Sequence, residues 1–125
     1  MPVVLTARFL RNMSTNGFFS LPGVKYQVGA ELGDIDLIAF CDGYLTYCEC
    51  KCLEETSPCA KLWDQIVSQF LETAKIAQKC KGNVVVLASL VTSYPDEVQK
   101  HIHAELGKQI PYLLLCKEDL EKSAM

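Results

Sequence analysis

The chain has 125 residues, half of them hydrophobic, and a formal net charge of −3 at pH 7. This length suits one domain, residues 1–125, with a single core, and the apolar content excludes a disordered tail. The negative charge argues against a polycation that coats DNA without specificity, although a local basic strip would not show in the total.

The seven cysteines are odd in number and irregularly spaced. The first ten residues lack the apolar segment and cleavage site of a signal peptide. No apolar run approaches the ~20 residues that a membrane span requires. We therefore expect a cytoplasmic protein with free thiols and no membrane contact.

The N-terminal segment, residues 1–23, is poorly defined by its pattern. Val3–Met13 fits either a short helix or a strand. Ser14–Gly17 and Pro22-Gly23 predict turns. No acidic residue occurs before Glu31.

A three-stranded meander is predicted next. Val24–Val28 alternates as a strand does, and Gly29–Gly33 predicts a turn. Two apolar runs, Asp34–Phe40 and Tyr44–Cys52, then flank Cys41-Asp42-Gly43. An Asp-Gly pair between two such runs is a strong hairpin signal.

Side chains alternate along a strand, which divides this hairpin into two faces. One face is expected to hold Asp34, Asp36, Ile38, Tyr47, Glu49 and Lys51, and the other Ile35, Leu37, Ala39, Cys48, Cys50 and Cys52. Charges within half-buried strands cost free energy unless they are paired or bind a metal. Asp36, Glu49 and Lys51 are therefore the candidate site.

The second half predicts helices alternating with strands. Ser57-Pro58 is a helix-start signal, and Gly82 and Gly107 are expected to end the two longer helices. Pro95 is expected to be the first residue of the second helix. The expected elements are a helix at 60–81, a strand at 83–90 covered on both faces, a helix at 95–106, a strand at 112–116 and a helical turn at 117–122. The whole order indicates an α/β fold with a mixed sheet flanked by helices.

Asp36, followed after the hairpin by Glu49-Cys50-Lys51, resembles the PD-(D/E)XK nuclease superfamily, which has the restriction-endonuclease-like fold. The segment looks most like the resolvase-type members, in which an acidic strand leads through a glycine turn into a hydrophobic-E-x-K strand. The resemblance covers Val24 to Leu115. It implies a three-stranded meander followed by helix, strand, helix and strand.

The resemblance also implies a chemistry. Asp36, Glu49 and the backbone carbonyl of Cys50 would hold Mg²⁺ or Mn²⁺, and Lys51 would be the catalytic lysine. Gln65 is the first choice for a supporting residue on the following helix, and Gln69 is the second. The expected activity is metal-dependent endonuclease cleavage of nucleic acid, with DNA favoured over RNA. Homodimerisation is expected from analogy alone.

Several alternatives stay open. The charged triple could be a cross-strand salt bridge, and the two glutamines could be solvated helix residues. The domain could bind nucleic acid or a protein without cleavage, or be the effector domain of a larger protein. Because the helix-borne acid of many relatives is absent, the site could use fewer ligands, depend on a part outside this sequence, or use Glu31. The three alternating cysteines, Cys48, Cys50 and Cys52, fit small buried hydrophobes better than a zinc site.

Overall fold

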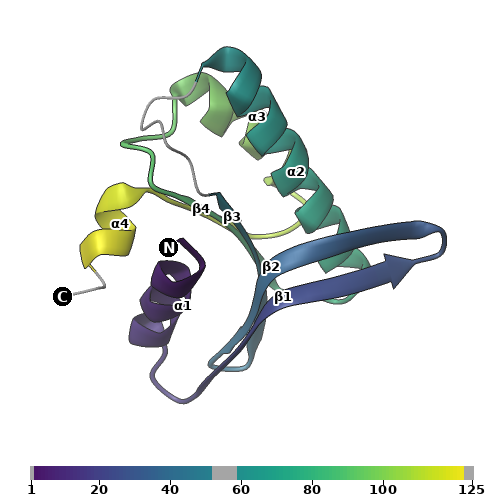
Figure 1. Ribbon diagram of the computed structural model, residues 1–125, viewed down its shortest axis with the longest axis vertical. Coiled ribbons are helices and arrows are strands. Elements are labelled where there is room, and N and C mark those ends of the chain that lie inside the picture. Colours follow the sequence, from purple (N-terminus) through teal and green to yellow (C-terminus); the bar gives the residue numbers. More distant parts are fainter. Residues whose placement is uncertain (1, 52–58, 123–125) are drawn as a thin grey trace.

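A five-stranded mixed sheet forms the centre of the molecule, with helices on both faces (Figure 1). The computed structural model describes residues 2–51 and 59–122, so the expected helix-start signal at Ser57-Pro58 lies outside it. The elements are α1 (Pro2–Met13), β1 (Phe18–Val28), β2 (Glu31–Cys41), β3 (Tyr44–Lys51), α2 (Ala60–Lys79), β4 (Val84–Ser89), α3 (Asp96–Leu106), β5 (Tyr112–Leu115) and α4 (Lys117–Lys122).

The spatial order of the strands follows the chain, β1-β2-β3-β4-β5. The first three strands pair antiparallel as a meander, and β3-β4 and β4-β5 pair parallel. This arrangement confirms the expected α/β fold, in which a meander is followed by helix, strand, helix and strand.

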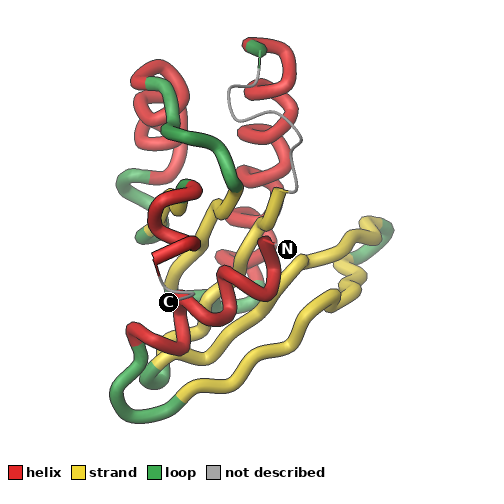
Figure 2. Tube along the Cα trace, turned by 60° about the vertical axis from the view of Figure 1, so that its left-hand side comes forward, coloured by secondary structure: helices red, strands yellow, loops and turns green. Residues whose placement is uncertain are grey.

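The sheet separates two hydrophobic clusters. Helices α2 and α3 cover one face, and α1 and α4 cover the other (Figures 1 and 2). Strand β4 lies between them, with Val85 and Leu87 in the first cluster and Val86 and Ala88 in the second. The continuous apolar run of β4 was therefore a correct sign of a strand buried on both faces.

The N-terminal segment is more regular than its sequence indicates. Its first part is the helix α1, and β1 begins at Phe18, well before the expected Val24. Pro22-Gly23, expected as a turn, lies inside β1. Proline is tolerated there because β1 is an edge strand, so its second side needs no ladder partner.

Two further glycine assignments change. Gly33 was expected in a turn, but the turn is shorter and Gly33 lies in β2, where a Cβ atom would overlap the phenol of Tyr26. The left-handed residue after α2 is Lys81, with φ 62°, and not Gly82. At Gly82 a Cβ would come within 2.8 Å of the Tyr47 ring, so close packing requires that glycine.

The remaining boundaries are close to expectation. Pro95 is the N-cap of α3, one residue before the helix begins. Along the described residues, no helix combines the length and apolar character needed to cross a membrane.

Candidate active site

Strand β2 is distorted at Asp36. The pairing of β2 with β1 passes over Gly23 and Asp36, and its pairing with β3 ends at Leu37 opposite Cys48. Gly23 has a φ of 61°, which glycine adopts without strain. Here the expected alternation is wrong, because Ile35 joins the α2 cluster while Leu37 joins the α1 cluster.

The carboxylate of Asp36 takes over a backbone role at this break. The Cys50 N–H donates to Asp36 Oδ2 at 2.8 Å. The bond joins β2 to β3 beyond the last paired residues. It gives a hydrogen-bond acceptor to the part-buried Cys50 amide, which has no backbone partner in β2. It also holds the Asp36 carboxylate beside the Glu49-Cys50-Lys51 segment.

The faces of β3 are as expected. Tyr47 joins the α2 cluster, whereas Cys48 and Cys50 pack into the α1 cluster. Glu49 and Lys51 contact side chains of α2, so they share the face of Tyr47. Cys52 lies outside the described residues.

Glu49 and Lys51 form an ion pair that α2 holds from above. Lys51 Nζ lies 2.8 Å from Glu49 Oε1, and Thr73 Oγ1 donates to Glu49 Oε2 at 2.9 Å. Lys51 Nζ also donates to Gln69 Oε1. The side chains of Lys51 and Glu49 are only 20% and 10% exposed, so solvent screens this pair less than a surface ion pair.

These side chains line a cavity of about 280 Å³ between the β1–β2 hairpin, β3 and α2. Its lining residues are Tyr26, Asp34, Asp36, Glu49, Lys51, Gln69, Glu72 and Thr73. Four carboxylates face one ammonium there, so the fully ionised lining is negative. The structure therefore brings Asp36, Glu49 and Lys51 to one cavity.

The two candidate glutamines separate. Both glutamines are exposed, but Gln69 contacts Lys51 and lines the cavity, whereas Gln65 does not line it. Gln65 lies one helical turn earlier on α2. Helix spacing showed that both share a face, but not which turn lies over Lys51.

Three lining residues were missed by sequence reasoning: Tyr26, Glu72 and Thr73. Thr73 follows Gln69 by four residues, so the spacing that selected the glutamines could have found it. Glu72 supplies an acid from α2. Helix α1 carries no acidic residue and packs on the opposite face of the sheet, and the side chain of Glu31 is outside the described part.

The donor set suits a hard divalent cation, because Mg²⁺ and Mn²⁺ prefer carboxylate, carbonyl and water oxygens. Asp36 and Glu49 offer such oxygens to one cavity. In the ranges 2–51 and 59–122, no three His, Cys, Asp or Glu side chains converge as a complete metal site. Cation binding would therefore use waters or backbone oxygens beside the two carboxylates.

The cysteines of β3 are packing residues. Cys48 is fully buried, and burial raises the pKa of its thiol well above the usual value. Burial likewise raises the pKa of Cys50 to about 12. Both side chains pack into the cluster between α1 and the sheet, which supports the expectation of small buried hydrophobes.

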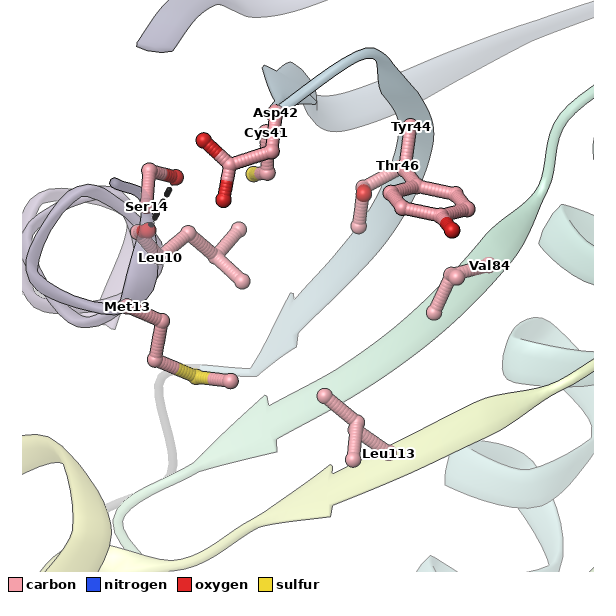
Figure 3. Close-up of a pocket in the computed structure, with 9 residues that line it drawn as sticks. All are labelled: Leu10, Met13, Ser14, Cys41, Asp42, Tyr44, Thr46, Val84 and Leu113. Carbon is pink, nitrogen blue, oxygen red and sulfur yellow. Dashed lines mark hydrogen bonds between the residues drawn. The ribbon is translucent and has the colours of Figure 1, made fainter. Parts of the chain in front are cut away.

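A second pocket, of about 190 Å³, lies at the other end of β3 beside α1 (Figure 3). Its lining residues are Leu10, Met13, Ser14, Cys41, Asp42, Tyr44, Thr46, Val84 and Leu113. The Ser14 hydroxyl, directly after α1, donates to the carbonyl of Leu10 in that helix (Figure 3). The Asp42 carboxylate, at the rim, accepts hydrogen bonds from the backbone amides of Thr15, Asn16 and Gly17. This pocket presents mainly apolar groups.

Comparison with solved structures finds a crystal structure described as a protein of unknown function, AF1548. It superposes with a TM-score of 0.65 at 19% sequence identity, over 98% of this chain and 64% of the other. This chain thus spans less than two thirds of that protein, and the likeness shows a shared α/β fold. No protein-family model and no curated protein sequence matches the chain.

Proposed function

We propose that this chain is a metal-dependent nuclease domain of the PD-(D/E)XK superfamily, with a restriction-endonuclease-like fold and a resolvase-type core. It would hydrolyse phosphodiester bonds of nucleic acid, with DNA favoured over RNA. One observation carries the proposal: Asp36, Glu49 and Lys51, the acids and lysine of the motif, line one cavity on neighbouring strands.

Asp36 and Glu49 would hold Mg²⁺ or Mn²⁺ together with the carbonyl oxygen of Cys50. A bound cation supplies Lewis acidity and lowers the pKa of a water molecule. Asp36 is held for this task by the Cys50 amide, and Glu49 by its contacts with β3 and α2. The acids thus keep their places without rearrangement of the strands.

Lys51 would present its ammonium group to the scissile phosphate and the attacking water. In the hydrolysis, the water gives up one proton as its oxygen bonds to phosphorus, the bond from phosphorus to the leaving oxygen breaks, and the leaving oxygen takes up one proton. Gln69 holds the ammonium in the cavity through its amide oxygen. We therefore assign the supporting role to Gln69 in place of Gln65.

The negative lining gives the proposal a further consequence. Without a cation, four carboxylates repel an approaching phosphate, and Lys51 alone does not offset them. Substrate binding itself, and not only cleavage, should therefore depend on a divalent cation.

A second candidate is a non-catalytic module that binds nucleic acid or a protein. The contacts within the site favour this second candidate, because Lys51 is already paired with Glu49 and the Asp36 carboxylate already accepts a hydrogen bond from the Cys50 amide. Such a module would bind a cation or nucleic acid without turnover.

A cleavage assay separates the two candidates. Supercoiled plasmid, linear duplex, single-stranded DNA, RNA and a four-way junction are incubated with Mg²⁺, Mn²⁺ or EDTA. The nuclease predicts metal-dependent cleavage that is lost in Lys51→Ala and kept in Lys75→Ala, which removes an exposed lysine of α2. Full cleavage by Lys51→Ala would refute the assignment, and folded protein that cleaves nothing would favour the binding module.

A further inference from the structure

Thr73 is a buried polar residue on the apolar face of α2. It is 4% exposed and lies among Phe70, Ala74, Ile76 and Ala77, all of which are buried. Threonine is a weaker helix former than alanine or leucine, and a buried hydroxyl costs free energy unless it is hydrogen-bonded. Packing alone would favour an apolar residue at this position.

The hydroxyl of Thr73 has one proton to donate, and Glu49 Oε2 accepts it. The other oxygen of Glu49, Oε1, meets Lys51. The two oxygens of this carboxylate are therefore distinguished by their partners. A carboxylate fixed at Oε2 by the helix cannot rotate freely about its last bond, so Oε1 stays directed at Lys51.

From these contacts we infer that Thr73 is the positioning residue of the site, which orients the Glu49 carboxylate for cation binding. The inference rests on the proposed function, in which Glu49 is a cation ligand. Groups that orient a ligand in this way change metal affinity by 10–100-fold when they are removed. The single Thr73 hydroxyl proton is already donated to Glu49, so in this proposal Thr73 acts through Glu49 and not as a ligand.

Helix α2 supplies both of the side chains that hold Glu49 and Lys51. Gln69 and Thr73 lie four residues apart, so consecutive turns of one helix hold Lys51 and Glu49. The buried face of α2 packs on the sheet through Ile66 and Phe70. The packed helix thus places Gln69 and Thr73 against Lys51 and Glu49.

The test compares variants that differ in one hydroxyl group. Thr73→Val keeps the shape of the side chain and removes the donor, whereas Thr73→Ser keeps the donor. Thr46→Val removes the hydroxyl of another buried threonine at the far end of β3. Mn²⁺ affinity is measured by calorimetric titration, and the melting temperature is recorded for each protein.

We expect Thr73→Val to raise the Mn²⁺ dissociation constant about tenfold, with Thr73→Ser and Thr46→Val within about threefold of the wild type. Unchanged affinity in Thr73→Val would overturn the inference. Should that variant not fold, Thr73→Ala also lacks the donor, and its comparison with Thr73→Ser decides the same question.

The nuclease and the positioning role fail in different ways. Wild-type protein that cleaves DNA while Thr73→Val binds Mn²⁺ normally overturns the positioning role alone. Protein that binds Mn²⁺ in a Thr73-dependent manner but cleaves nothing overturns the nuclease alone. Wild-type protein that does not bind Mn²⁺ overturns both.

Discussion

The two ends of strand β3 lie in opposite chemical surroundings. At the Lys51 end, four carboxylates and one ammonium line a cavity beneath α2. At the Tyr44 end, a smaller pocket beside α1 is lined mainly by apolar groups (Figure 3). The same eight-residue strand thus takes part in both.

The difference shows where packing accounts for the residues and where it does not. Apolar side chains such as Leu10 and Val84 are expected against a sheet, because their burial stabilises the fold. A buried glutamate such as Glu49 is not expected there on packing grounds, because ionised groups lose hydration energy on burial. The partners of Glu49 offset that loss, and they hold its carboxylate at the cavity where we propose a cation site.

At the polar end, the largest loss of activity is expected from Asp36→Asn, which removes the negative charge and keeps the shape of the side chain. Removing a group that only orients a metal ligand lowers metal affinity or activity about 10–100-fold. Removing a direct ligand should therefore reduce cleavage at least ~100-fold. Cleavage rates and Mn²⁺ affinity measure the effect. The variant should stay folded, because the Asn oxygen can still accept the Cys50 amide.

Asp34→Asn is the matched control for Asp36→Asn. Asp34 lines the same cavity two residues earlier but is exposed. Its variant should cleave within about threefold of the wild type, because it is no direct ligand in the proposed site. Equal losses in both variants would mean that total negative charge matters, and not the position of Asp36.

At the apolar end, Leu10→Ala should affect stability and leave the chemistry unchanged. Leu10 is 4% exposed in the cluster between α1 and the sheet. Large-to-small substitution in a core costs roughly 2–5 kcal/mol of unfolding free energy. Urea denaturation measures the loss, and the cleavage rate per folded molecule should not change.

Val4→Ala is the control for Leu10→Ala, because Val4 lies on the same helix but is about half exposed. It should cost well under half as much. A fall in cleavage rate in folded Leu10→Ala would show that the two ends of β3 are coupled through the strand.

Sequence patterns predicted the elements around the polar end of β3 but left the segment of α1, which covers the apolar end, undecided between a helix and a strand. The apolar run of β4 and the helical spacing of α2 predicted the sheet and its covering helix, because burial produces strong periodicity. The motif predicted that Asp36, Glu49 and Lys51 would gather in space. Whether they bind a cation or cleave nucleic acid stays a prediction.

The finer geometry depends on contacts between distant segments. The break at Asp36 involves Gly23 of the edge strand, and no local pattern couples the two positions. The choice of Gln69 over Gln65 depends on how far α2 has advanced along β3, which is set by packing of the whole helix. Thr73 was missed because a threonine in an apolar helix face carries no motif of its own.

The smallest effect is expected from Asp42→Asn at the rim of the apolar pocket. The amides of Asn16 and Thr15 donate to the Asp42 carboxylate and hold its pKa below the usual value. A lowered pKa in the folded state means that this contribution to stability is present above the unfolded pKa of about 4 and is lost as the pH falls through the folded value. Asparagine also tolerates the left-handed conformation of this residue, where φ is 52°.

We therefore expect Asp42→Asn to melt slightly below the wild type at pH 7 and the gap to close below pH 4. Thermal melts at pH 7, 4 and 3 measure it, with the exposed Asp64→Asn as control. A gap that stays constant with pH would show that the Asp42 charge does not stabilise the α1–β1 connection, and a change in cleavage would link this rim to the polar end of β3.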